Sequence, residues 1–250
     1  MAVPPFHWWR TVFFLIPAIA VYTIVLGTLS LLSVVVDRRG HLAHSCARAW
    51  AFLILKTTGV RVSISGLDAL PRDTPYLFLA NHQSIYDIPV LFWHLPYQIR
   101  ILAKASLGSF PFLGWHLRRS GHVLVDRRNP GNSTMLQIKE LMRQRVSLLV
   151  FPEGTRSADG RVARFRAGIV LLAIEAGLPI VPVAVEGTRH VMRKGRLMTC
   201  PGDVRVRVME PVPTGPWEAS QARELAGVIE RTVRAGVEQL QGPPNDADRR

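Results

Sequence analysis

The sequence predicts an α/β protein with a mixed, mostly parallel sheet flanked by helices, preceded by an N-terminal membrane-associated two-helix segment. Short β-rich runs alternate with helical stretches from Val60 onward, a pattern typical of parallel strands joined by crossover helices. A long uncharged run, Thr11 to Val36, precedes them. The 250 residues are enough for one sizeable domain and an appendage.

The uncharged run predicts an apolar helix over 11–36. Such a helix would be about 39 Å long, which exceeds the ~30 Å hydrocarbon core of a bilayer. Ala18-Ile19-Ala20 imitates a signal-peptide cleavage site, but the apolar run continues far beyond it, which favours an anchor. A buried helix of a soluble protein is the remaining interpretation, and it is less typical at this length.

Gly40 separates this helix from a second one, expected over 41–56. The second helix carries apolar side chains on one face at helical spacing and polar ones on the other. It fits an amphipathic anchor in the membrane interface, or a helix packed on the domain. We therefore expect a membrane anchor over 1–58, a globular domain over 59–240 and a disordered polar tail over 241–250.

Two arrangements of the helix pair are open. In one, the first helix spans the bilayer and the second lies on its surface; in the other, both dip into one leaflet with Gly40 at the buried tip. Asp37, Arg38 and Arg39 beside that tip would each cost roughly 2.5–3.5 kcal/mol at the bilayer centre, which favours the span. The excess of positive charge that follows the uncharged run then places the domain on the cytoplasmic side of the cell (inner) membrane, with the N-terminus outside.

Within the domain, β-branched and apolar runs predict seven strands, at 61–65, 76–80, 99–103, 122–125, 147–151, 180–185 and 204–209. Helical spacing predicts helices over 88–94, 133–145 and 168–176 and an amphipathic closing helix over 217–240. No internal repeat is present in the sequence.

The formal net charge of +13 favours polyanionic partners. Neither zinc-finger spacing nor an RNA-binding aromatic motif is present, so we expect no nucleic acid; an anionic membrane surface and phosphorylated substrates remain. Cys46 and Cys200 fit a reducing compartment rather than a disulfide framework. His41 and His44 lack partners at metal-ligand spacing, so no metal is expected.

The most informative segment is Asn81-His82-Gln83-Ser84-Ile85-Tyr86-Asp87, which follows one expected strand and precedes a helix. His82 in the loop and Asp87 at the helix start can form a general base and the carboxylate that orients it. The same residues also fit a role of Asp87 as a helix N-cap only, with Pro89 in the first turn.

A second segment, Phe151 to Ser157, follows another buried run and contains Glu153, Gly154, Thr155 and Arg156. Proline and glycine make a stiff, open turn, and a hydroxyl beside a guanidinium suits a phosphate. An isolated turn of this kind is also an ordinary strand exit with a solvated arginine.

Together the two segments resemble the glycerolipid acyltransferase family, most closely the 1-acyl-glycerol-3-phosphate acyltransferases of phospholipid biosynthesis. The resemblance covers 40–215 and follows four blocks in the family order: Asn81 to Asp87, Gly121 to Arg127, Phe151 to Ser157 with Phe165-Arg166-Ala167-Gly168, and Ile180 to Val183. One departure is Arg166, where many relatives carry lysine, and the charge is kept.

The resemblance makes 59–240 an acyltransferase domain that forms phosphatidic acid. It implies His82 and Asp87 as the catalytic pair, and Glu153, Gly154, Thr155 and Arg156 as substrate-binding residues. It also implies Lys104 and Arg127 on the phosphate side. A solvated lysine at the strand end explains Lys104 equally simply, and a surface charge is the less favoured alternative for Arg127. The acyl donor would be acyl-CoA or acyl carrier protein, used as a substrate, with no cofactor.

The chain lacks Gly-x-Ser-x-Gly and the phosphate loop of NTPases, so direct transfer without an acyl-enzyme is the simplest mechanism. A glycerol-3-phosphate or lyso-ornithine-lipid acyltransferase is the alternative within the same chemistry. A non-catalytic membrane adaptor is the alternative from another class, and the intact set of His82, Asp87, Glu153 and Arg156 argues against it.

Overall fold

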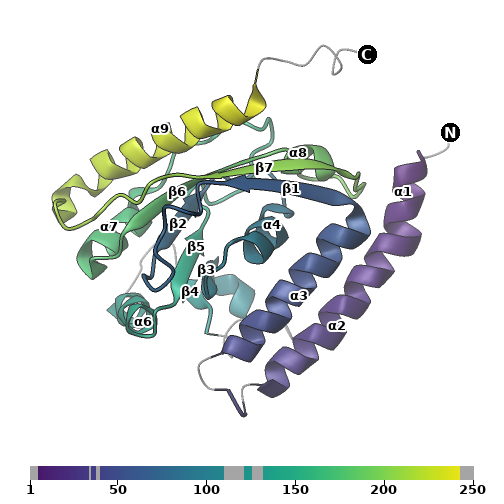
Figure 1. Ribbon diagram of the computed structural model, residues 1–250, viewed down its shortest axis with the longest axis horizontal. Coiled ribbons are helices and arrows are strands. Elements are labelled where there is room, and N and C mark those ends of the chain that lie inside the picture. The colour runs from purple at the N-terminus through teal and green to yellow at the C-terminus, as the bar shows by residue number, and fades with distance from the viewer. Residues whose placement is uncertain (1–4, 34, 38–39, 110–120, 126–131, 243–250) are drawn as a thin grey trace.

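The computed structural model describes residues 5–33, 35–37, 40–109, 121–125 and 132–242. Its strands form one sheet between two layers of helices, and a pair of N-terminal helices lies along one side (Figure 1). The strands are β1 (Val60–Ser65), β2 (Leu77–Ala80), β3 (Ile99–Lys104), β4 (Val123–Val125), β5 (Ser147–Val150), β6 (Ile180–Glu186) and β7 (Gly202–Val208). The helices are α1 (Phe6–Arg10), η1 (Thr11–Leu15), α2 (Ile16–Ser33), α3 (His41–Thr58), α4 (Asp87–His94), η2 (Ala105–Ser109), α6 (Asn132–Arg143), α7 (Ala167–Ala176), α8 (Thr188–Val191), η3 (Ala219–Gln221) and α9 (Ala222–Gln241).

The strand order is β1-β7-β6-β2-β5-β3-β4. Every neighbouring pair runs parallel except β6 with β7. The predicted fold class, a mixed and mostly parallel sheet flanked by helices, is confirmed. Each predicted strand is present, although β7 begins two residues earlier than expected, and the short helices η2 and α8 were not predicted.

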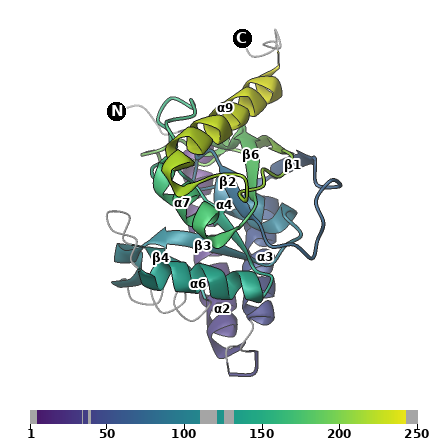
Figure 2. The ribbon, with the colours of Figure 1, turned by 90° about the vertical axis from the view of Figure 1, so that its left-hand side faces the viewer.

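Alternate side chains of β2 pack into two separate apolar cores. Phe78 and Ala80 pack on the side of α3 and α4, and Leu77 and Leu79 pack on the side of α6, α7 and α9. Figure 2 shows α6 and α7 in front of the sheet and α3 behind it. Because β2 and β5 are buried on both faces, they are continuous apolar runs, as the sequence indicated.

The N-terminal segment is a helical hairpin. α1, the π-helical turn η1 and α2 form one continuous rod, which packs antiparallel to α3 (Figure 1). Near the middle of the rod, the two helices are joined by hydrogen bonds from Trp50 Nε1 to Thr23 Oγ1 (3.0 Å) and between Tyr22 Oη and Thr57 Oγ1 (3.0 Å). Among the described helices, the rod Phe6–Ser33 alone is long and apolar enough to cross a membrane, and it supports membrane association.

The start of the rod is tied to the rest of the protein. At its start, the Arg10 guanidinium donates to the carbonyls of Thr57 and Thr58, 3.0 and 2.8 Å away, and Thr11 Oγ1 accepts from the backbone N–H of Thr199 at 2.9 Å. These contacts hold the beginning of the rod against the domain, at the end of α3 next to β1.

The junction at the other end also lies on the domain. Asp37 accepts from the backbone N–H groups of Gly40 (3.1 Å) and Leu42 (2.6 Å) and so closes the start of α3. The Gly40 carbonyl accepts from the guanidinium of Arg100 in β3 at 3.3 Å. Contacts of this kind favour a rod whose start stays on the side of the domain, whereas the predicted span with the N-terminus outside and the second helix on the surface stays a prediction.

The remaining boundaries differ from the predictions by a few residues. The first helix covers Phe6–Ser33 rather than 11–36, and the second ends at Thr58 rather than 56. The closing helix α9 ends at Gln241, so most of the expected disordered tail lies outside the described residues.

Candidate active site

The segment that carries His82 leaves the buried end of β2 and reaches Asp87 at the first turn of α4. His82 Nδ1 lies 2.7 Å from Asp87 Oδ2. The Asp87 side chain is 0% exposed and that of His82 is 16% exposed, so the carboxylate is enclosed while the imidazole keeps access to solvent. Asp87 does not cap α4, because Tyr86 is the N-cap residue and makes no side-chain cap bond.

Asp87 accepts several further hydrogen bonds. Its Oδ2 receives the backbone N–H groups of Gln83 (2.7 Å) and Ser84 (2.9 Å), and its Oδ1 receives the Thr188 hydroxyl (2.5 Å). A carboxylate surrounded by donors acts as an acceptor toward His82 as well, so Nδ1 of the imidazole carries the hydrogen. Nε2 is then left with a lone pair that can accept a proton.

The loop around His82 is braced by side chains. Asn81 is buried, and its amide both donates to the Val185 carbonyl and accepts from the Val185 N–H, each at 2.8 Å. Ser84 Oγ donates to the Met192 carbonyl (2.7 Å), and Gln83 donates to the Gly160 carbonyl (3.1 Å). These three side chains therefore hold the loop in place from the β6 side and from the 159–162 loop.

The second predicted segment lies beside the first. The Phe151 ring stacks on the His82 ring with centroids 4.1 Å apart. The backbone N–H of His82 donates to Glu153 Oε1 (2.8 Å), and the His82 carbonyl accepts from the N–H of Ser157 (2.7 Å). The segment with the 153–156 turn therefore contacts both the backbone N–H and the backbone carbonyl of His82.

Glu153 faces inward. Its second carboxylate oxygen, Oε2, accepts from the backbone N–H of Ala163 at 3.2 Å. Burial raises the pKa of the Glu153 carboxyl, and the hydrogen bonds from His82 and Ala163 act in the opposite direction. Glu153 therefore holds two loops together beneath the turn, a positioning contact that its place in the sequence did not reveal.

The outer side of the turn is cationic. Gly154 has a φ of +78°, and a Cβ added there would lie 2.9 Å from the guanidinium carbon of Arg166. The Arg156 side chain is half-buried and makes no hydrogen bond or ion pair with any residue the structure describes. Lys194 Nζ donates to Thr155 Oγ1 (3.1 Å) and to the Arg156 carbonyl (2.8 Å).

Two predicted residues remain without a described side chain. Lys104 is the last residue of β3, where its backbone pairs with Val125, and Arg127 lies outside the described residues. Sequence reasoning missed Thr188 and the site contacts of Lys194. Lys194 belongs to the charged run Arg193-Lys194-Gly195-Arg196, and nothing in the spacing of that run indicates that it folds back on the 153–156 turn.

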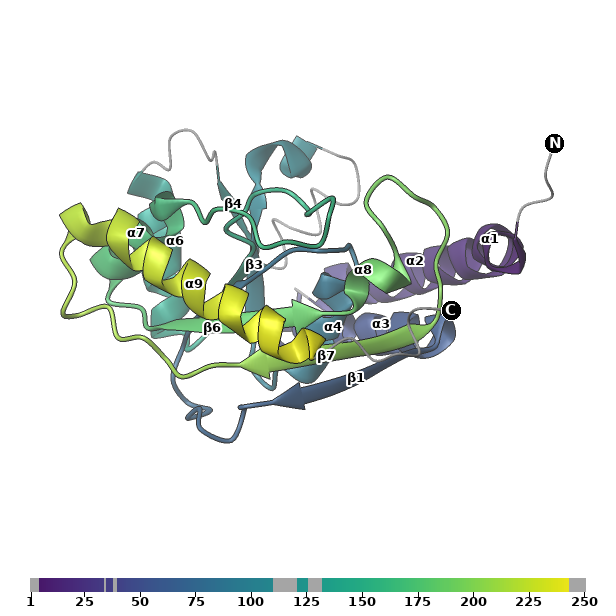
Figure 3. The ribbon, with the colours of Figure 1, turned by 90° about the horizontal axis from the view of Figure 1, so that it is seen from above.

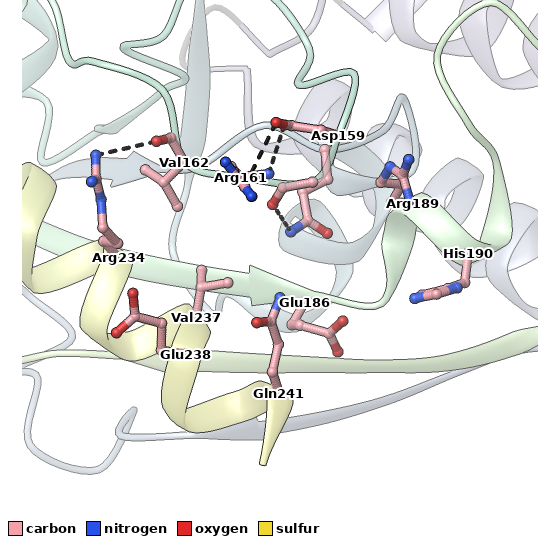
Figure 4. Close-up of a pocket in the computed structure, with 12 residues that line it drawn as sticks. Asp159, Arg161, Val162, Glu186, Arg189, His190, Arg234, Val237, Glu238 and Gln241 are labelled. Carbon is pink, nitrogen blue, oxygen red and sulfur yellow. Dashed lines mark hydrogen bonds and ion pairs between the residues drawn. The ribbon is translucent and has the colours of Figure 1, made fainter. Parts of the chain in front are cut away.

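A cavity of about 520 Å³ opens on the other side of Gln83, between the 159–162 loop, α8 and α9 (Figure 4). His82 does not line it. Two of its arginines lie beside carboxylates, since Arg161 is 3.9 Å from Asp159 and Arg234 is 2.6 Å from Glu230, and the third, Arg189, donates to the Ala158 carbonyl. We therefore place the candidate site at His82 and the 153–156 turn rather than in this cavity.

Comparison with known proteins agrees with the site. A model of the Acyltransferase family matches residues 61–186, about half of the chain. The chain therefore belongs to the acyltransferase family. The matched range includes the His82–Asp87 pair and the 153–156 turn.

The names of the similar proteins are more specific than the name of the family. A 1-acyl-sn-glycerol-3-phosphate acyltransferase from Cocos nucifera is 30% identical over 197 residues, 77% of this chain and 62% of that protein. The alpha form from Homo sapiens is 34% identical over 181 residues, 70% of this chain and 63% of that protein. The chain thus spans less than two thirds of the length of these relatives.

The crystal structure of the 1-acyl-sn-glycerophosphate (LPA) acyltransferase PlsC from Thermotoga maritima is also similar, with a TM-score of 0.75 and 25% sequence identity. The match covers 96% of this chain and 100% of that chain, so the likeness includes the N-terminal helix pair as well as the sheet.

Proposed function

We propose that this protein transfers an acyl group from an acyl thioester to the free hydroxyl of 1-acyl-glycerol 3-phosphate, which yields phosphatidic acid. The observation that carries the proposal is the 2.7 Å contact between His82 and a fully buried Asp87, directly beside a cationic turn. The names of the relatives supply the acceptor.

His82 acts as the general base. Nε2 takes the proton of the acceptor hydroxyl, and the freed oxygen attacks the thioester carbonyl. Asp87 keeps the hydrogen on Nδ1 and stabilises the imidazolium that forms, as an orienting carboxylate does. Collapse of the tetrahedral intermediate breaks the carbon–sulfur bond, and the thiolate leaves with the proton from the imidazolium.

The 153–156 turn receives the phosphate of the acceptor. The Arg156 guanidinium offers a planar pair of N–H donors, which matches phosphate geometry, and Thr155 offers a hydroxyl. Gly154 leaves the turn open, while Glu153 holds it against the His82 backbone. Lys104 and Arg127 remain proposed contributors on the same side.

The donor is acyl-CoA or the acyl thioester of acyl carrier protein, and neither a cofactor nor a metal enters the reaction. We further propose that the enzyme lies on the cytoplasmic side of the cell membrane. The net charge of +13 attracts it to anionic lipid, where the acceptor is dissolved.

The test measures thiol release by purified protein in detergent, with each donor and a panel of acceptors. We expect release from acyl-CoA or acyl carrier protein that depends on 1-acyl-glycerol 3-phosphate. Preference for glycerol 3-phosphate or a lyso-ornithine lipid would reassign the acceptor. Absence of release with every pair would favour a non-catalytic adaptor and contradict the proposal.

A further inference from the structure

One loop of the domain reaches the proposed site and the N-terminal helix together. Between α8 and β7, residues 192–201 extend from the sheet toward α1 and α2 (Figure 3). At one end of the loop, the Met192 carbonyl accepts a hydrogen bond from the Ser84 hydroxyl. At the other end, the backbone N–H of Thr199 donates to Thr11 Oγ1. These two contacts fix both ends of the loop.

Lys194 lies between these anchored ends. Its ammonium group donates to Thr155 Oγ1 at 3.1 Å and to the Arg156 carbonyl at 2.8 Å. An ammonium group has three N–H bonds, so one remains for another acceptor. Because Thr155 Oγ1 is used as an acceptor by Lys194, its own hydrogen stays available to donate.

The charge around the turn is strongly unbalanced. Arg156, Arg166 and Lys194 lie on or against it, whereas the Glu153 carboxylate is turned inward onto two backbone N–H groups. Asp159, further along the segment, is engaged by Ser157 and Arg161. A dianionic ligand would meet this excess of cationic charge beside His82.

We propose that Lys194 determines specificity for the phosphate of the acceptor. It donates directly to the phosphate, and it holds Thr155 and the Arg156 backbone so that their side chains face the same ligand. This inference rests on the proposed function, and it adds a residue from a distant part of the chain to the binding turn.

The experiment compares steady-state kinetics of the wild type and Lys194→Ala in the full-length protein. We expect KM for 1-acyl-glycerol 3-phosphate to rise about 10- to 100-fold, the usual consequence of losing a hydrogen bond to a charged group. We expect kcat and KM for the acyl donor to change less than about 3-fold. Lys194→Arg, which keeps the charge, should recover most of the affinity.

Arg196→Ala is the matched control, because it removes an exposed cation from the same loop without a described contact to the turn. An equal loss in this variant, a fall in kcat alone, or parallel rises in both KM values would overturn the proposal. If Lys194→Ala fails to fold by thermal unfolding, Lys194→Gln takes its place and its result decides.

A binding measurement separates this inference from the proposed function. Equilibrium dialysis of radiolabelled 1-acyl-glycerol 3-phosphate, without any donor, needs no turnover. Weaker binding to Lys194→Ala by about 10- to 100-fold supports the phosphate contact even in a protein that turns out to transfer no acyl group. Equal binding to the wild type and the variant refutes it.

Discussion

Asp87 receives its hydrogen bonds from two distant parts of the chain. His82, Gln83 and Ser84 are near it in sequence, but Thr188 lies 101 residues further along the chain. The nearby pair could be predicted because a loop and a helix start bring residues five apart into contact. Thr188 and Lys194 could not, because only the crossing of β6 beside β2 places α8 and its following loop over the site.

His82→Ala tests the base itself. Removing a positioned general base should lower kcat by on the order of 10²–10⁴. The fold should persist, because the bracing contacts of this loop come from the backbone of His82 and from Asn81 and Ser84. Turnover is measured by thiol release and folding by thermal unfolding. Near-normal turnover in a folded variant would contradict the mechanism.

His44 should make stability depend on pH. It is 9% exposed in α3, and burial, together with the positive charges of Arg100 and Arg48, lowers its pKa to about 4 from 6.5. The folded state therefore favours the neutral ring. The stabilisation from this preference is complete above pH 6.5, where the unfolded chain is neutral as well, and it is lost as pH falls from 6.5 through 4.

The expected loss over this window is about 3 kcal/mol at most. We predict that His44→Leu reduces the slope of the unfolding free energy against pH between 6.5 and 4, measured by urea titration in detergent at several pH values. His190→Leu, which changes an exposed histidine of α8, is the control. Identical slopes for the wild type and His44→Leu would exclude His44 as the source.

At the scale of elements, β2 is shorter than its neighbour β6, and Asn81 extends the pairing. The ladder ends where Ala80 pairs with Val183, and the Asn81 amide then binds both the N–H and the carbonyl of Val185. A side chain that replaces a backbone group in this way lets the chain leave the sheet toward His82 without leaving buried polar groups of β6 unpaired.

Asn81→Ala should therefore destabilise the domain. It leaves a buried N–H and a buried carbonyl of Val185 without partners, at about 1–3 kcal/mol each, so the expected loss is about 2–6 kcal/mol. The free energy of unfolding is measured by urea titration. Gln137→Ala removes an exposed amide from α6 and serves as the control. A loss no larger than that of the control would show that the two hydrogen bonds between Asn81 and Val185 do not stabilise the domain.

The elements themselves were largely predictable, because β-branched runs and helical spacing are local signals. The pairing of the strands was less predictable. β7 alternates buried and exposed residues, which predicts a strand but not its direction, and it runs antiparallel to β6 while pairing parallel with β1. The turn at 153–156 was found by its residue types, but the inward orientation of Glu153 depends on the loop that returns at Ala163.

At the scale of the whole molecule, the hairpin geometry bears on how the protein meets a bilayer. The rod Phe6–Ser33 packs on α3 with one side and exposes apolar side chains along its length, among them Phe13, Val21, Ile24 and Leu32. Its start contacts the end of α3, and the Gly40 junction that follows it contacts Arg100 in β3. A rod that lies in one leaflet, roughly along the interface, immerses the apolar side chains while the charges near Gly40 stay at the head groups, which avoids the cost of a charged tip in hydrocarbon.

We therefore predict that the start of the rod lies on the same side of the membrane as the domain. The test uses a Cys46→Ser, Cys200→Ser background with a single new cysteine, either Phe6→Cys at the exposed start of α1 or Arg231→Cys on the exposed side of α9. In sealed spheroplasts, an impermeant maleimide should label neither site until the membrane is permeabilised, since both face the cytoplasm in the proposed location. Inverted vesicles should label both. Labelling of Phe6→Cys in intact spheroplasts, while Arg231→Cys stays protected, would mean that the rod leaves α3 and crosses the bilayer.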